Sequence, residues 1–543
     1  MKKILLFGFL ITGVAQLMFH SHLAAQERDL PSEQIEVIRS FEARLMDAEK
    51  LRLSPTIPGP DTTRILTYDY TLSSRPLAVT YTEPDIRPIG MRKESLPEPY
   101  NGFLRAGYGF PNSPLLEAGY HLDNQSNMSM AITGRHLSAK KDDIPNQRFR
   151  DTHVALSGQY VLSPYFTVAT DVSYDINDYY YYALHFLEDS TINENVKKRY
   201  QNLSAQAKIS NSQPTDNHMD YFAAIKLNHL TDNRASRENN LDLTFGATKW
   251  LDETHPFSLE LGLEFTGLKD TLTRHLNNFY LKPTFTWVDD RFSIMAGLNL
   301  SSSSDEFYFF PLAEASYKIA GHTLVAFAGI DGDLYKNNYT NLSSYNPFIN
   351  HRLDSLGNSS RTKIYGGVKG LYRQFTYSAE VRYQSIDRMA FYLPNENLPY
   401  LFDPIFDESK VYTGEITLAA RINDNIRLQT QATLNLFRPE TEEEAWHIPA
   451  LVWNFGGMYT SLDQKFQLKA NLFVESGIQY RDEDGDTESL SGLFDLNLSA
   501  DYFFNDHLAA FVSVQNIFNN KRQRWVNYPS FGINAHAGVF LRF

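Results

Sequence analysis

The chain has 543 residues, no cysteine and a formal net charge of −14 at pH 7. Without cysteine there are no disulfides, thiolate metal sites, cysteine nucleophiles or lipid anchors on cysteine. The acidic balance argues against a nucleic-acid partner, which favours a basic patch. Aromatic residues make up 14% of the chain although only 42% is hydrophobic, a composition that suits strands with one apolar and one polar face.

Residues 1–25 have the pattern of a secretory signal peptide. Lys2 and Lys3 form the charged start, 4–18 is mostly apolar, and Leu23-Ala24-Ala25 is an acceptable cleavage site. The alternative is an N-terminal membrane anchor, but the apolar run is short for a membrane span. No later run is long and apolar enough for a transmembrane helix, so the sequence predicts an exported protein without helical spans.

Residues 26–99 form a polar leader that is rich in proline after residue 52. Within it, 32–51 has the spacing of a short amphipathic helix, although an extended conformation fits equally well. Proline removes a backbone donor and blocks helix formation, so 53–99 is expected to be extended and irregular. Short alternating runs lie at 67–70 and 77–81. The leader is either a periplasmic tether or a segment in the lumen or periplasmic mouth of a barrel.

From Tyr100 onward, apolar and polar residues alternate in run after run. In 257–265, Phe and Leu occupy every second position and Ser, Glu and Gly occupy the others; 426–436 and 466–474 repeat the pattern. A soluble β-sandwich array is the alternative, but the chain has no further segments to cover so many apolar faces. A charge facing lipid would cost about 2–4 kcal/mol near the midplane, so the polar faces must line a wet lumen. The fold class predicted for 100–543 is therefore all-β, a transmembrane antiparallel β-barrel with lipid as the partner of its outer face.

Counting these runs predicts 22 strands, an even number as in single-chain bacterial barrels. The predicted strands are 101–110, 115–123, 127–137, 152–162, 165–176, 199–209, 218–230, 241–251, 257–267, 278–288, 291–301, 308–319, 322–334, 362–372, 375–384, 411–421, 425–436, 450–460, 465–475, 491–503, 507–517 and 532–543.

Short and long connections alternate between the predicted strands, which orients the barrel because periplasmic turns are short and extracellular loops are long. The long connections are 138–151, 177–198, 335–361, 385–410, 437–449, 476–490 and 518–531. Aromatic residues beside the short turns predict a periplasmic girdle at the headgroup layer. These are Tyr165, Phe166, Trp250, Phe257, Trp287, Phe292, Tyr317, Tyr372, Phe375, Tyr502 and Phe503.

No catalytic, cofactor-binding or metal-binding residue is predicted, and no enzyme is expected. The acidic run 482–486 departs from the EF-hand loop because Gly485 takes the fourth place rather than the sixth, so a solvated loop is favoured, as for Glu440 and 442–444. Histidines occur singly, and neither G-x-S-x-G nor H-E-x-x-H is present. Loop 385–410 is unusually apolar and could constrict the lumen or bind a partner or an apolar ligand. Loop 335–361 suits sugar stacking through its Tyr and Asn residues, but ordinary loop packing is favoured.

The C-terminal region 508–543 resembles TonB-dependent receptors. A hydrophobic strand ends in Asn516-Ile517-Phe518, Tyr528-Pro529 and Gly532 follow, and the closing strand ends at Phe543, as in bacterial outer-membrane proteins. Segments within 35–110 are similar to a Bacteroidetes group in which a short Pro-rich leader replaces the plug. The resemblance implies a barrel in the bacterial outer membrane. It leaves energy-coupled import in doubt, because receptors of this family have a globular plug domain that 26–99 is too short to form.

Two functions fit this reading. The first is uptake or passage of an unknown solute through the lumen across the outer membrane, with the leader as a possible removable stopper. A lumen of this strand number is wide enough to need filling. The alternative is a structural or assembly barrel that docks partner envelope proteins, such as a periplasmic or surface lipoprotein, through the leader.

Overall fold

The computed structural model describes residues 100–124, 127–163, 165–183, 196–213, 218–304, 306–461 and 463–543. The predicted signal peptide 1–25 and leader 26–99, with its possible helix 32–51, lie outside the described residues. Of the helices in the described part of the chain, none has the length and apolar character that a membrane crossing requires.

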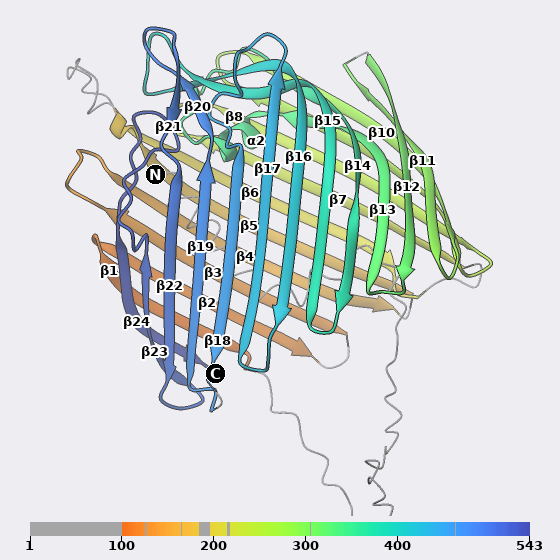
Figure 1. The fold of residues 1–543 in the computed structure, drawn as a ribbon, viewed down its shortest axis with the longest axis horizontal. Helices are drawn as coiled ribbons and strands as arrows, with labels where there is room; N and C mark the ends of the chain where they lie inside the picture. Colours follow the sequence, from red (N-terminus) through yellow and green to blue (C-terminus); the bar gives the residue numbers. More distant parts are fainter. Residues whose placement is uncertain are drawn as a thin grey trace, which may run out of the picture. The chain divides into compact units, whose positions relative to one another are not determined.

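A 22-stranded antiparallel sheet closes on itself to form the barrel (Figure 1). Each strand pairs with its neighbour along the chain, and β1 closes the sheet on β24, with Phe103 opposite Arg542 and Phe110 opposite Ala535. The wall strands are β1 Gly102–Phe110, β2 Ser113–Asn124, β3 Met128–Lys140, β4 Arg148–Ser163, β5 Phe166–Tyr180, β6 Lys197–Asn211, β7 Met219–Asp232, β8 Arg237–Leu251, β9 His255–Lys269, β10 Thr273–Val288, β11 Phe292–Ser303, β12 Glu306–Ala320, β13 Leu324–Asn337, β14 Gly357–Tyr372, β15 Phe375–Pro394, β16 Phe402–Arg421, β17 Ile426–Pro439, β18 Leu451–Thr460, β19 Phe466–Ser476, β22 Leu493–Phe503, β23 Leu508–Gln515 and β24 Asn534–Arg542.

Two smaller elements lie in the loops of the predicted extracellular end. Helix α2 (Tyr339–Tyr345) follows β13, and the hairpin of β20 (Ile478–Arg481) and β21 (Thr487–Leu490) connects β19 to β22. Figure 1 places α2 and this hairpin at the end of the barrel away from the short turns.

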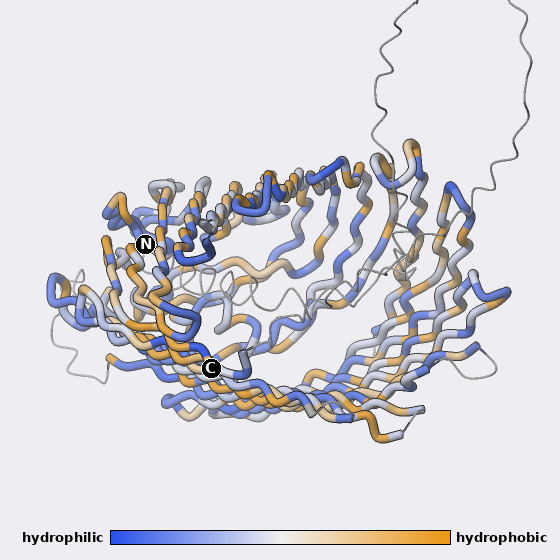
Figure 2. Tube along the Cα trace, turned by 90° about the horizontal axis from the view of Figure 1, so that it is seen from below, coloured by the Kyte–Doolittle hydropathy of each residue, from blue (hydrophilic) through white to orange (hydrophobic). Residues whose placement is uncertain are grey.

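The predicted alternation sets which face of each strand meets lipid. On β17, Leu434 and Leu436 are 49% and 52% exposed on the outer face, whereas Gln429, Gln431 and Asn435 take the intervening positions on the lumen face. Figure 2 shows hydrophobic and hydrophilic residues alternating along the wall. A closed barrel with this apolar outer surface belongs in the bacterial outer membrane, where every backbone group finds its partner within the sheet.

Glycines in the wall make room for aromatic rings of the neighbouring strand. Gly262 pairs directly with Tyr280, and a β-carbon on Gly262 would lie 2.1 Å from the Tyr280 ring. Gly246 likewise pairs with Phe222, and a β-carbon on Gly246 would lie 2.2 Å from the Phe222 ring. The aromatic rings cover the glycine backbone, which has no side chain of its own. Such glycine–aromatic pairs curve the sheet and fix the register of neighbouring strands.

Each of the 22 predicted runs coincides with one wall strand, so the fold class and the number of strands are confirmed. The prediction that 385–410 is a loop is wrong. Strands β15 and β16 extend through most of it, and only 395–401 connects them. A register shift between Ile386 and Met389, where Arg388 has φ of +57°, breaks the alternation there and hides the continuation of the strand.

The girdle prediction is wrong for two of its residues. The Trp250 indole donates to the Asp220 carboxylate at 2.7 Å, so it points to the lumen. Phe503 shares its face of β22 with buried Asp501, and its ring packs on that of Phe540 at 6.0 Å. Other members of the set are exposed on the outer face, as expected: Tyr165, Phe257, Trp287, Tyr317, Tyr372, Phe375 and Tyr502.

Candidate functional site

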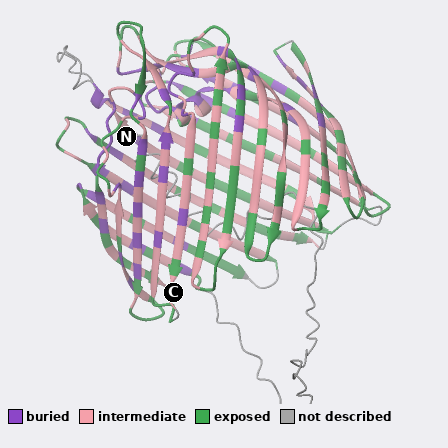
Figure 3. Cartoon of the chain, in the orientation of Figure 1, coloured by how far each residue is buried: buried purple, intermediate pink, exposed green. Residues whose placement is uncertain are grey.

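Loops at the predicted extracellular end pack against one another across the mouth of the barrel. They come from the β5–β6, β13–β14, β15–β16 and β23–β24 connections, which are far apart in the strand order. Figure 3 shows many of the buried residues gathered at this end, around α2. We call this assembly the loop cap. Its buried core contains Tyr181, Tyr182, Tyr200, Tyr339, Leu342, Phe348, Ile349, Leu353, Tyr392, Tyr400, Leu401, Phe402, Trp525 and Tyr528.

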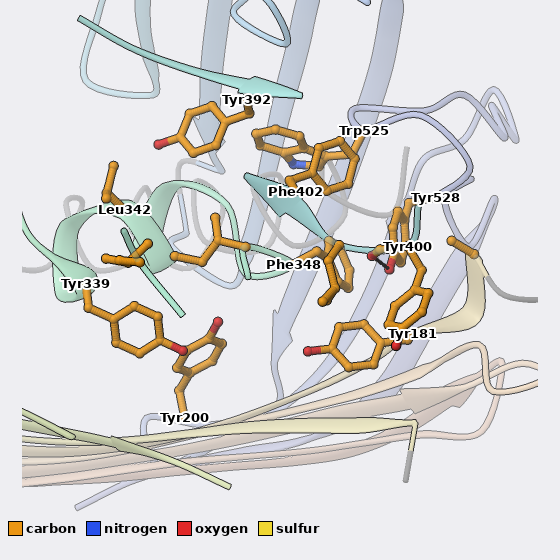
Figure 4. Close-up of a cluster of buried hydrophobic side chains, with 14 of the residues drawn as sticks. Tyr181, Tyr200, Tyr339, Leu342, Phe348, Tyr392, Tyr400, Phe402, Trp525 and Tyr528 are labelled. Carbon is orange, nitrogen blue, oxygen red and sulfur yellow. Dashed lines mark hydrogen bonds between the residues drawn. The ribbon is translucent and has the colours of Figure 1, made fainter. Parts of the chain in front are cut away.

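The loop cap is an aromatic core in which rings from different loops touch directly (Figure 4). The rings of Phe348 and Tyr528 are stacked at 3.8 Å between centroids. Tyr182 meets Tyr528 edge to face at 4.8 Å, and Tyr392 meets Trp525 at 5.2 Å. Aromatic pairs contribute about 0.5–1.5 kcal/mol each beyond the burial of their area, so the loops stabilise one another across the lumen axis.

Residues 516–533, which connect β23 to β24, lie at the centre of the loop cap; we call them the strap. The Tyr182 hydroxyl donates to the Pro529 carbonyl at 3.2 Å, and the Tyr528 hydroxyl donates to the Tyr400 carbonyl at 2.6 Å. The Lys141 ammonium donates to the Phe531 carbonyl at 2.9 Å. The strap therefore joins loops from several sides of the mouth.

A buried ion pair holds the middle of the strap to the wall. The Arg524 Nε lies 3.1 Å from Glu475 Oε1, and the two side chains are 5% and 4% exposed. The same guanidinium donates to the Tyr345 hydroxyl at 2.7 Å and to the His447 carbonyl. Burial opposes the charged form of Arg524, but the facing Tyr345 and Glu475 raise its pKa above the usual value.

Helix α2 docks on the inner wall formed by β6, β7 and β8. The Tyr339 hydroxyl donates to Asp232 at 2.6 Å and accepts from the Lys198 ammonium at 2.8 Å. Lys198 and Asp232 also pair directly, and neither side chain is exposed. The backbone N–H of Tyr339 donates to Glu238 Oε2 at 2.6 Å. Burial raises the pKa of Tyr339 well above its usual value, so its hydroxyl stays a donor.

A second cluster stiffens the cap beside the strap. Phe391 at the top of β15 packs with buried Trp446 of the β17–β18 loop. The Arg481 guanidinium of β20 stacks 4.8 Å above the Trp446 ring and pairs with Glu442 at 2.7 Å. The apolar character predicted for 385–410 therefore serves packing among the loops.

Side chains of alternating charge line part of the lumen wall below the cap. Arg105, Glu117, Arg135, His153 and Asp175 lie directly opposite one another on β1 to β5. Arg105 continues the row to Asp501 of β22 at 3.2 Å, and His153 is 2.6 Å from Asp175. The lumen face is thus polar and charged with both signs, as is usual for the interior of a transmembrane barrel.

The other loop predictions have plain structural outcomes. Tyr339 and Phe348 of 335–361 are buried in the cap core, which agrees with ordinary loop packing. In the acidic run, Asp482 Oδ1 accepts from the backbone of Asp484 and Asp486 and so shapes the turn of the β20–β21 hairpin. Among the described residues, no cluster of three or more His, Asp or Glu side chains is arranged to hold a metal ion.

Sequence reasoning missed the core residues supplied by Tyr181, Tyr182, Trp525 and Tyr528. They lie in the predicted long loops 177–198 and 518–531. The one available signal was the number of aromatic residues in loops that water was expected to cover.

No protein-family model matches the chain, and no curated protein matches it in sequence. Solved structures do match. The FrpB iron transporter of Neisseria meningitidis aligns with a TM-score of 0.65 and 11% identity over 82% of each chain. The ferric-catecholate import receptor Fiu of E. coli K12 aligns with a TM-score of 0.62 and 9% identity over 82% of each chain.

A third match is the ferripyoverdine receptor of the Pseudomonas aeruginosa outer membrane, solved with ferripyoverdine bound. It aligns with a TM-score of 0.59 and 12% identity, over 82% of this chain and 72% of the receptor. The chain therefore has the barrel fold of TonB-dependent receptors.

Proposed function

We propose that this protein is a gated outer-membrane conduit for solute uptake. The observation that carries the proposal is the combination of a polar, charged lumen with loops that pack against one another across the mouth. Loops held by side-chain contacts can separate without breaking the sheet, so the barrel can open while its wall stays intact.

The structural neighbours support a transport role over catalysis. They are named as an iron transporter, a ferric-catecholate import receptor and a ferripyoverdine receptor. By analogy with those names, a metal chelate is the first solute class to test. The low identity carries no ligand contact over to particular residues of this chain.

We further propose that the leader 26–99 acts as a stopper for the periplasmic side. It directly precedes β1 in the sequence. A barrel of 22 strands is too wide for its own wall side chains to fill, which favours a segment inside it.

A barrel that docks partner envelope proteins remains the second candidate. The observation in its favour is that the loops of the cap pack around two buried cores, which gives the outer surface a fixed shape. A lipoprotein is the partner class expected for that role.

Planar-bilayer conductance of four proteins separates these functions: the mature chain, a variant lacking 26–99, a variant with 523–531 replaced by a glycine–serine linker, and the combination. Conduit function predicts a closed mature protein and a large pore in the combined variant. Four closed proteins would contradict it and favour the docking role. If replacing 523–531 is sufficient to open a large pore while the leader is still present, the leader is not a stopper.

A further inference from the structure

Three polar side chains beside the strap have buried atoms without a hydrogen-bond partner among the described residues. Asn534 at the start of β24 is fully buried, and neither its Oδ1 nor its Nδ2 is paired with any described residue. Gln515, directly opposite on β23, has an unpaired buried Oε1, and Asp495 on β22 has an unpaired Oδ1 and is 5% exposed. We call Asp495, Gln515 and Asn534 the polar floor.

The strap lies directly along this floor. The backbone N–H of Asn516 donates to the Asn497 Oδ1 at 2.9 Å, and that of Ile517 donates to the Leu496 carbonyl at 3.1 Å. The Arg522 guanidinium donates to the Gly492 carbonyl at 2.6 Å. These contacts place the first half of the strap beside 492–497 of the β22 edge, which includes Asp495.

A buried polar group without a partner disfavours the state that buries it, because water would satisfy it in the alternative state. The floor therefore opposes closure of the strap. The Arg524–Glu475 pair acts in the other direction, since its partners form it only when the strap is docked. The ion pair thus adds to the aromatic packing of Trp525 and Tyr528 in favour of closure, whereas the polar floor acts against it.

Four residues of the strap have positive φ: Asn516, Asn519, Asn527 and Gly532. Asn516 and Gly532 bound it with φ of +50° and +76°, in the left-handed region that Asn and Gly tolerate best. A β-carbon on Gly532 would lie 2.4 Å from the Asn519 Oδ1, so glycine also permits the close approach that folds the strap back.

We propose that the strap is the moving gate of the extracellular mouth, that the Arg524–Glu475 pair holds it shut, and that the polar floor favours its release. This inference rests on the proposed conduit function for its biological meaning. The motion itself is a property of the strap and is measured without any solute.

The test uses the absence of cysteine in the chain. Ser530 in the strap is 2% exposed, so in a Ser530→Cys variant a membrane-impermeant maleimide labels the thiol only when the strap lifts. Asp484→Cys, at the exposed tip of the β20–β21 hairpin, reports full reagent access. Resistance of the folded barrel to SDS before heating confirms that each variant is folded.

Adding Glu475→Gln removes the charge that pairs with Arg524 and is expected to speed labelling of Ser530→Cys at least about tenfold. A third protein adds Asn534→Leu and Gln515→Met to the Ser530→Cys, Glu475→Gln variant. These changes replace unpaired polar groups by apolar ones of similar size and are expected to slow labelling about tenfold relative to that variant. Arg524→Lys provides a second way to weaken the pair, because a single ammonium cannot form the forked contacts.

Unchanged labelling in both Glu475→Gln and Arg524→Lys would overturn the role of the ion pair. Equal or faster labelling after Asn534→Leu with Gln515→Met would overturn the role of the floor. Conductance of the same variants tests the conduit function separately. If labelling changes as expected but no variant forms a pore, the strap moves as proposed and solute passage is contradicted.

Discussion

The docking of α2 on the wall depends on a buried charge pair, and Lys198→Met tests it. In the folded protein Lys198 and Asp232 are both fully buried, and the Tyr339 hydroxyl bridges them. Lys198→Met removes the ammonium, so the negative charge of the buried Asp232 carboxylate has no positive partner there. The Tyr339 hydroxyl of α2 remains as a hydrogen-bond donor to it. Breaking a buried pair in this way costs about 3–5 kcal/mol. Undocking of α2 lets water reach the carboxylate and relieves that cost.

Hydrogen exchange of the α2 backbone amides measures this directly, because local opening sets their protection. A change of about 3–5 kcal/mol corresponds to a loss of protection of at least about a hundredfold. Asp232 also accepts from the backbone of Arg234 and Ser236 through Oδ1, which asparagine retains. The double variant Lys198→Met, Asp232→Asn is therefore the matched control and should recover most of the protection. Protection of Lys198→Met within about threefold of the parent would refute the argument.

Three further predictions follow from the wall and the cap. Gly262→Ala places a methyl group against the Tyr280 ring and should lower stability by about 1–3 kcal/mol in thermal unfolding, whereas Gly414→Ala, with nothing within 4 Å, should be nearly neutral. Ile416→Lys puts a charge on the lipid face and should cost about 2–4 kcal/mol in urea titrations, while Thr417→Lys on the lumen face should be tolerated; equal costs would contradict the facing of β16. Burial and the Lys198 charge lower the pKa of His351, so α2 protection should fall as pH drops below about 6.5, and His351→Gln should flatten that fall.

The wall was predictable because lipid on one side and water on the other impose a period of two on every strand. Even where the pattern was interrupted, as in β12 where the buried Phe310 directly follows the exposed Phe309, enough alternation remained to place the strand. The prediction failed where strands leave the membrane. Beyond Ile386 the upper part of β15 packs into the loops, so both of its faces are apolar and the alternation is lost.

The loop cap could not be predicted, since its contacts join residues far apart in the sequence without any periodic pattern. Tyr528 meets Tyr182 and Phe348 from two other loops, and nothing in the sequence near each residue indicates the others. The resemblance to a receptor pattern marks Tyr528 and Pro529 in the sequence but does not indicate that they are buried. The structure shows a physical use for both: a ring in the cap core and a carbonyl that accepts from Tyr182.

Accessibility of the lumen from outside tests the central claim, that the loop cap seals the barrel. Gln431 lies on the lumen face of β17, where its side chain is exposed. In cells that display the Gln431→Cys variant, a membrane-impermeant maleimide should not label the thiol while the strap is intact. It should label the thiol once 523–531 is replaced by a glycine–serine linker. Fast labelling of the protein with an intact strap would contradict closure of the mouth by the loop cap, and absence of labelling in both proteins would contradict the role of the strap in that closure.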